Sequence, residues 1–327
     1  MSSSGIPQPT DHGPSLDVAA AEAVLRKLEF AVRNKLDGLL QGNYVGLVPG
    51  PGTEAGESRP YALGDDVRRM DWPVTARTTV PHIRQTVADR ELETWLAVDL
   101  SPSMDFGTAN TEKRELVLAA LTAVVHLTVR GGNRVGAVVA NGPQSYVVPA
   151  RAGRAHARHL LRRVALTPRA EEAGRNDLAR LLESLRRPPR RRGLVAVVSD
   201  FLTSTGDGAA DAPAPWERPL RGLSDRHQLL AVEVLDPREL ALEPAGLVTF
   251  VDPETGRQLE VQTSDPAVRV RYAAAAAAQR ERIAAGLRHA GAAHLQLRTD
   301  RDWVTDIVKF VIARRRFVVG AVGAGVR

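Results

Sequence analysis

Cysteine is absent from the 327-residue chain, which excludes disulfide scaffolds, thiolate zinc sites, iron–sulfur clusters and cysteine nucleophiles. Aromatic residues make up only 4% of it, few for a protein that stacks nucleic-acid bases. No apolar run approaches the ~18 residues that a membrane span requires, and the first residues lack the basic and apolar segments of a secretory signal. These absences favour a cytoplasmic protein that neither spans a membrane nor binds nucleic acid.

Lysine is also scarce, because the chain has only four, at positions 27, 35, 113 and 309. Arginine therefore supplies nearly all of the basic charge, and the formal net charge is +6. A balance of this size permits contact with an acidic partner but does not require it. The 43% of hydrophobic residues and 25% of charged residues are ordinary for a globular protein.

Apolar segments that are typical of buried strands alternate with segments of helical periodicity. This alternation predicts an α/β fold: a doubly wound, mostly parallel sheet covered on both faces, with a small N-terminal helix and strand extension. We expect strands at 82–88, 93–98, 134–140, 145–149, 194–198, 229–235 and 294–297, and a hairpin over 247–261. We expect helices at 15–40, 112–130, 154–165, 177–185, 216–225, 266–290 and 303–315.

The composition divides the chain into four parts. Residues 1–14 are rich in serine, proline and glycine and are expected to be a disordered tail. Residues 15–92 hold an amphipathic helix, with Ser15 as its predicted N-cap, followed by a polar segment. Residues 93–317 form the predicted α/β domain, and residues 318–327 form a C-terminal tail.

Polar residues with oxygen-bearing side chains follow the two most apolar strands. A D-x-S-x-S sequence begins at Asp99, and Ser199-Asp200 ends the second strand. Ligands of open α/β sheets bind beyond the carboxyl ends of the strands. Oxygen ligands from several loops suit Mg²⁺ or Mn²⁺ ahead of zinc. The candidate metal ligands on the two strand ends are Asp99, Ser101, Ser103 and Asp200, and a third polar loop, Gly174-Arg175-Asn176-Asp177-Leu178, lies between them in the chain.

This pattern resembles the metal-ion-dependent adhesion site of von Willebrand factor A domains, the fold shared by integrin inserted domains. In that family a D-x-S-x-S loop, a threonine of a second loop and an aspartate of a third hold the ion. Asp99, Ser101, Ser103 and Asp200 match these positions, and Asn176 stands in the place of the threonine. The resemblance implies a von Willebrand factor A-like fold and a site for Mg²⁺ or Mn²⁺ whose affinity is weakened at Asn176.

A second resemblance lies upstream. The sequence Y-A-L-G-D-D-V-R-R-M-D-W at 61–72, the pair Ala76-Arg77, and Asp89-Arg90 ahead of the D-x-S-x-S strand are similar to the bacterial family called domain of unknown function fifty-eight. The match covers about residues 40 to 235. It implies the same fold and frequent pairing with MoxR-type AAA+ ATPases, and it implies no established reaction.

Two further groups of residues have simpler structural interpretations. His156 and His159 lie one helical turn apart among arginines, without acidic residues at metal-ligand spacing, so we expect a solvated helix face. The acids and arginines of the upstream signature are expected to form a structural network that fixes the N-terminal segment to the domain. Its predicted members are Asp65, Asp66, Arg68, Asp71 and Arg77.

The sequence thus predicts a non-enzymatic, Mg²⁺-dependent protein-interaction module. Its metal would bind a carboxylate of a partner, such as a MoxR-type AAA+ ATPase or a client of that ATPase. Two alternatives stay open. One is a scaffold that works without metal through its basic surface. The other is a metal-assisted phosphoesterase or hydrolase, although the chain shows no G-x-S-x-G elbow, Walker A loop or dinucleotide fingerprint.

Overall fold

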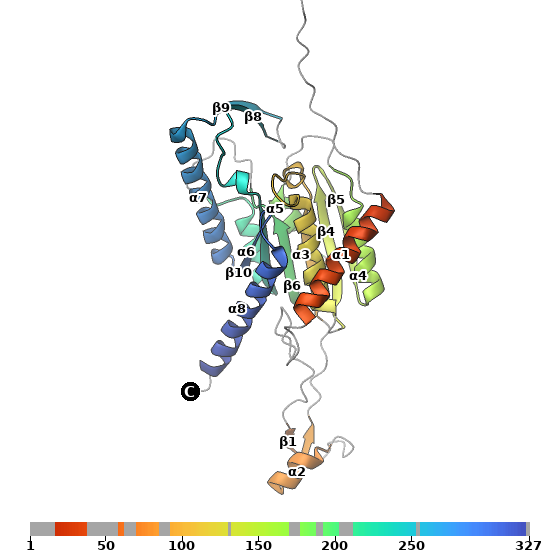
Figure 1. Ribbon diagram of the computed structural model, residues 1–327. Helices are drawn as coiled ribbons and strands as arrows, with labels where there is room; N and C mark the ends of the chain where they lie inside the picture. The colour runs from red at the N-terminus through yellow and green to blue at the C-terminus, as the bar shows by residue number, and fades with distance from the viewer. Residues whose placement is uncertain are drawn as a thin grey trace, which may run out of the picture.

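A six-stranded sheet forms the centre of the molecule, in the order β10-β7-β6-β3-β4-β5 (Figure 1). Neighbouring strands pair in parallel except β4 and β5, which form an antiparallel hairpin at one edge. The strands are β3 (Glu93–Asp99), β4 (Arg134–Asn141), β5 (Gln144–Arg151), β6 (Gly193–Ser199), β7 (His227–Leu235) and β10 (Ala292–Arg298). The computed structural model describes residues 17–37, 58–61, 70–84, 92–129, 132–169, 177–187, 192–202, 212–252 and 256–324.

The two central strands, β3 and β6, are buried along their whole length. Their near-continuous apolar sequences are those of strands covered on both faces. Gly193 begins β6 opposite Glu93, and a Cβ atom there would lie 1.9 Å from the Glu93 carbonyl oxygen. The close approach of these strands therefore requires glycine at this position. The predicted doubly wound, mostly parallel sheet is confirmed.

One face of the sheet is covered by four helices: α1 (Val18–Asp37), α3 (Lys113–Val129), α4 (Arg154–Ala165) and α8 (Trp303–Ala324). Helix α3 is buried on nearly all sides, because it lies between the sheet and α1. Figure 1 shows α1 crossing α3 and α4 on the outside. The apolar stripe of α1 packs into the same core as the strands, so this N-terminal helix is an outer layer of the α/β domain. The stripe consists of Ala21, Leu25, Leu28, Val32 and Leu36.

The opposite face is covered by α5 (Leu178–Ser184), α6 (Glu217–Ser224) and α7 (Pro266–His289). Trp216, directly before α6, is fully buried and meets Phe201 edge to face, with ring centroids 5.3 Å apart. Phe201 follows β6, so this aromatic pair anchors the loop that carries Asp200 to the helical layer.

Smaller elements complete the described part of the chain. A hairpin of β8 (Leu247–Val251) and β9 (Gln258–Gln262) precedes α7, and the short 3₁₀ helices η2 (Pro102–Met104) and η3 (Pro237–Glu239) follow β3 and β7. Upstream, β1 (Ser58–Pro60) pairs with β2 (His82–Arg84) beside α2 (Trp72–Thr78).

The predicted element boundaries differ from the structure at the two ends of the chain. Asp17 caps α1, since its Oδ1 accepts a hydrogen bond of 2.7 Å from the Ala20 backbone. The predicted cap, Ser15, lies outside the described residues, as does the expected tail at 1–14. Helix α8 runs to Ala324, past the predicted end at 315 and into the segment expected to be a tail. Strand β2 ends at Arg84, and residues 85–91 lie outside the described part.

Candidate functional site

The carboxyl ends of β3 and β6 bring four of the five predicted ligands together. Ser103 Oγ donates a 2.8 Å hydrogen bond to Asp200 Oδ2, and it lies 3.1 Å from Ser101 Oγ. Asp99 holds the same loop, because its Oδ1 accepts from the Ser101 backbone at 2.9 Å. The fifth predicted ligand, Asn176, lies outside the described residues. Its neighbour Asp177 caps α5 through the Arg180 backbone.

Asp99 has a buried carboxyl group whose ionisation costs free energy. Only 3% of its surface is exposed, and its Oδ2 accepts a 2.7 Å hydrogen bond from Ser199 Oγ. Burial, together with the negative charge of Asp200, raises the pKa of Asp99 to about 6. A cation between the two carboxylates would favour the charged form of both.

Asp200 has a different electrostatic environment. Burial alone would raise its pKa, but the ammonium group of Lys113 lowers it below the usual value, helped by hydrogen bonds from Leu202 N and Ser103 Oγ. The Lys113 Nζ atom lies 2.8 Å from Asp200 Oδ2. Asp200 is therefore held as a carboxylate, and a poor base, at neutral pH.

Lys113 belongs to the candidate site, and the sequence alone did not point to it. It is the first residue of α3, is fully buried, and also lies 2.7 Å from Glu239 Oε1. Burial alone would lower its pKa, but Asp200 and Glu239 raise it, so the side chain stays protonated. Two signals were available: lysine is rare in this chain, and this one opens a strongly apolar helix. Neither signal identifies its two partners.

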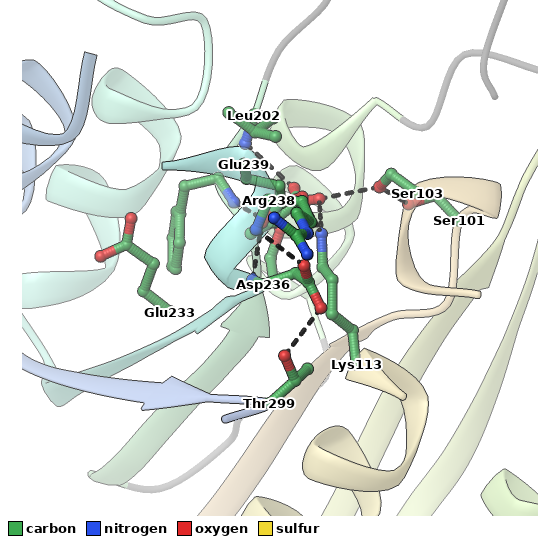
Figure 2. Close-up of polar contacts among 12 residues, drawn as sticks. Ser101, Ser103, Lys113, Leu202, Glu233, Asp236, Arg238, Glu239 and Thr299 are labelled. Carbon is green, nitrogen blue, oxygen red and sulfur yellow. Dashed lines mark hydrogen bonds and ion pairs between the residues drawn. The ribbon is translucent and has the colours of Figure 1, made fainter. Parts of the chain in front are cut away.

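The Lys113 ion pairs extend into a network that joins the loops after four strands. Glu239 Oε2 accepts from the Asp236 backbone at 2.9 Å. Asp236 in turn accepts hydrogen bonds from Thr108 and Thr299, which follow β3 and β10. Figure 2 shows Lys113 pointing into this group from α3, with Ser101 and Ser103 beside it. The network fixes the edge of the sheet at which the predicted ligands gather.

Helix α7 contributes one further support. Arg280 Nη1 donates to Glu233 Oε1 at 2.8 Å and to the carbonyl oxygen of Asp200 at 3.2 Å. The next residue, Phe201, has a φ of 56°, in the left-handed region that few residues other than glycine adopt. Arg280 and the contact of Phe201 with Trp216 thus hold the loop after β6 in an unusual backbone conformation.

The chemistry of the gathered donors fits a hard divalent cation. Hydroxyl and carboxylate oxygens are ligands of Mg²⁺ and Mn²⁺. Among the described residues, no group of three or more histidine or acidic side chains is placed to hold a metal. An ion at this site would therefore depend on Ser101, Ser103 and water as well as on the two aspartates, as the adhesion-type resemblance implies.

One predicted member of the upstream network has a structural role within its own segment. Asp71 accepts from Ser58 Oγ at 2.6 Å and from the Val74 backbone at 3.3 Å, and so it caps α2 and ties it to β1. Arg77 is exposed on α2. The remaining predicted members of that network, Asp65, Asp66 and Arg68, lie outside the described residues.

Among the described residues, the two histidines of α4 belong to no group of three or more histidine or acidic side chains that could hold a metal. His159 is exposed, as expected for a solvated helix face. His156 corrects that expectation, because it is half-buried and its Nε2 lies 3.0 Å from the Val135 carbonyl oxygen of β4.

The sheet order, the antiparallel edge hairpin and the D-x-S-x-S loop define a von Willebrand factor A-like domain. Residues 57–282 match the family described as "Protein of unknown function DUF58". The chain belongs to this family, which confirms the resemblance seen in the upstream signature.

Two mycobacterial proteins are similar to the chain in sequence. The uncharacterized protein Rv1480 of Mycobacterium tuberculosis is 53% identical over 310 residues, covering 93% of this chain and 95% of that protein. The uncharacterized protein MAV169 of Mycobacterium avium is 48% identical over 169 residues, covering 52% of this chain and 94% of that protein.

Similar solved structures include the conserved hypothetical protein BatB of Bacteroides thetaiotaomicron, at 16% identity and a TM-score of 0.40, over 67% of this chain and 98% of that one. The SpRpn10 VWA domain is similar at 10% identity and a TM-score of 0.35, over 67% of this chain and 93% of that one. Within the described ranges, no helix combines the length and apolarity needed to cross a membrane.

Proposed function

We propose that the chain is a protein-interaction module that binds Mg²⁺ or Mn²⁺ at the β3–β6 edge and, through the ion, a carboxylate of a partner protein. The observation that carries the proposal is the convergence of Asp99, Ser101, Ser103 and Asp200. The two serines and Asn176 would ligate the ion directly, and the two aspartates mostly through water. One position would remain for an aspartate or glutamate side chain of the partner.

The properties of the ligands support binding of an acidic group. Hydroxyl ligands bring no negative charge, so an ion held by Ser101 and Ser103 keeps a strong attraction for one more carboxylate. The aspartates are held in place by hydrogen bonds with Ser199, Ser103 and backbone amides.

The same contacts argue against hydrolysis. Ser103 donates to Asp200, which has the geometry of a hydroxyl beside a base, but the lowered pKa of Asp200 makes it a weak proton acceptor. Lys113 is protonated and held between two carboxylates, so it is not a base either. These contacts favour a binding module over a phosphoesterase or hydrolase.

The partner in this proposal is a MoxR-type AAA+ ATPase or a client of that ATPase. Its basis is the membership of the chain in the DUF58 family, which the sequence resemblance links to such ATPases. We place the interaction in the cytoplasm, where an ATPase has its nucleotide and Mg²⁺.

A calorimetric titration of Mg²⁺ and Mn²⁺ into the metal-stripped full chain tests the proposal, with Asp99→Asn as the control. We expect saturable binding in the natural chain and its loss in the variant. Capture of a purified MoxR-type ATPase should then require the ion and be abolished by EDTA. Absence of metal binding at millimolar concentrations would overturn the proposal.

One observation favours a second candidate, a scaffold that binds its partner without metal. The Lys113 ammonium already supplies a positive charge to Asp200, which is part of what an ion would provide. Binding by such a scaffold would be unaffected by EDTA and weakened by salt, because it would depend on exposed charges.

A further inference from the structure

Lys113 places a positive charge inside the candidate metal site. Its Nζ atom lies 2.8 Å from Asp200 Oδ2, the same oxygen that accepts the hydrogen bond from Ser103 Oγ. The side chain is fully buried, so water does not screen this charge from its surroundings. Any ion bound by Ser103 and Asp200 would therefore be sensitive to the ammonium group.

The position of Lys113 is unfavourable by ordinary rules. It is buried, and it begins α3, where the helix dipole disfavours a cation. Its two carboxylate partners, Asp200 after β6 and Glu239 in η3, compensate this cost. A buried ion pair seldom improves stability over apolar side chains of the same size, so stability alone does not explain a charged residue at this position, although its ion pairs join the loops of the network.

The charge of Lys113 affects how the site would bind a cation and a carboxylate. The carboxylates of Asp99, Asp200 and Glu239 outnumber the one ammonium group. A divalent cation brings this cluster close to neutrality, which leaves the ion able to attract an outside carboxylate. Without Lys113, the same cluster would stay negative after it bound the ion, and it would repel an acidic ligand.

We propose that Lys113 determines the specificity of the site: it weakens the binding of Mg²⁺ and strengthens the binding of a carboxylate to the ion-loaded site. This inference rests on the proposed function and names the residue that sets the affinity for the ion against the affinity for the carboxylate. Glu239 acts in the opposite sense, because its negative charge offsets that of Lys113.

Three variants of the full chain test the inference: Lys113→Met, Glu239→Gln and the double variant. Glu239→Gln keeps a side-chain oxygen that can accept the hydrogen bond from the Asp236 backbone N–H, which Glu239 Oε2 accepts in the natural chain. The double variant removes the ammonium without leaving the Glu239 carboxylate unpaired, so it protects the test against misfolding of Lys113→Met. Circular dichroism and thermal unfolding would establish that each variant is folded.

Two binding measurements are made on each protein. Mg²⁺ affinity is measured by calorimetry on the metal-stripped chain. Carboxylate binding is measured with acetate as the probe, through the broadening of its methyl proton resonance by Mn²⁺ bound to the protein.

For Lys113→Met we expect Mg²⁺ to bind about tenfold more tightly or better, and acetate to bind several-fold more weakly. Glu239→Gln should shift both affinities the other way. The double variant should lie between Lys113→Met and the natural chain, because Lys113 is the group that contacts Asp200.

A purely structural ion pair would move both affinities in the same direction or leave both unchanged, and either result overturns the inference. If the natural chain binds Mg²⁺ and the variants bind it equally well, the inference alone fails. If the folded natural chain and folded variants all bind no Mg²⁺, the proposed function fails as well.

Discussion

Asp99 is a residue at which the proposed metal binding and the stability of the metal-free protein oppose each other. Its pKa of about 6, against 3.8 for the ordinary side chain, means that the folded protein disfavours the ionised form. As the pH rises, Asp99 therefore loses its proton at a lower pH in the unfolded chain than in the folded protein. The free energy of unfolding consequently falls between about pH 4 and about pH 6. A neutral isostere would not show this fall.

We predict that Asp99→Asn stabilises the metal-free protein by about 1–3 kcal/mol at pH 7.5, with a smaller gain at pH 5. The same variant should lose metal binding. Urea denaturation at the two pH values measures the difference. Asp177→Asn, which keeps an exposed N-cap on α5, should change stability little. A less stable Asp99→Asn protein would contradict the argument.

Glu233 shows the opposite behaviour. It is fully buried and accepts hydrogen bonds from Arg280, His294 and Gln296. Burial alone would raise its pKa, but these partners lower it below the ordinary 4.5. The stability that they provide is therefore present above about pH 4.5 and is lost as the pH falls through the lowered pKa.

Replacing Glu233 by glutamine leaves the Arg280 guanidinium without its buried counter-charge. We expect a loss of about 3–5 kcal/mol at pH 7 and a shallower decline of stability below pH 4.5, both measured by urea denaturation. Glu281→Gln removes an acid whose side chain is 72% exposed and should cost under about 0.5 kcal/mol. Equal losses in the two variants would show that burial does not decide the effect.

At the residue scale, the sequence predicts a contact when two residues lie at the same end of neighbouring parallel strands. Asp99 ends β3 and Asp200 directly follows the neighbouring strand β6, so their proximity follows from the parallel sheet. Lys113 begins a helix, and its partner Glu239 lies in a 3₁₀ helix far along the chain. No periodicity relates two such positions, and the pair could not be inferred before the structure.

Among the elements, β6 begins very close to the backbone of β3. A methyl group on Gly193 would meet the Glu93 carbonyl oxygen at 1.9 Å and its carbonyl carbon at 2.8 Å. These atoms belong to the backbone of a fully buried strand, so neither moves without disturbing the sheet.

Gly193→Ala should therefore destabilise the protein by more than about 2 kcal/mol. Gly222 is the matched control, because it lies in α6 with nothing within 4 Å of a Cβ atom. Gly222→Ala should stabilise the protein by about 0.5–1 kcal/mol, through helix propensity. Thermal unfolding of both variants gives the comparison, and a neutral Gly193→Ala would show that the strands can separate.

Element boundaries were predictable where local signals agree. The α4 boundaries equal the predicted 154–165, since Gly153 with a φ of 98° precedes the helix and a regular apolar stripe fills it. The end of α8 was predicted too early. Arginine favours helix interiors, and α8 continues through the arginines at 314–316 to Ala324.

At the scale of the whole molecule, the sequence predicts the doubly wound sheet but not the place of α1. An amphipathic stripe shows that one face of a helix is buried, without showing against what. In the structure this stripe packs against α3, α4 and α8, and Glu22 and Lys35 add ion pairs to Arg158 and Asp302. The match to the DUF58 family begins at residue 57 and so does not include this layer.

If α1 is a layer of the core, truncating one of its buried side chains should destabilise the whole domain. Leu25 is fully buried, whereas Phe30 on the same helix is 68% exposed. We expect Leu25→Ala to cost about 2–5 kcal/mol and Phe30→Ala to cost under about 0.5 kcal/mol, as measured by urea denaturation. A single transition in both variants would show that α1 unfolds with the sheet. An early separate transition in Leu25→Ala would instead make α1 an independent attachment, and a chain that begins at residue 57 would then retain the stability of the α/β domain.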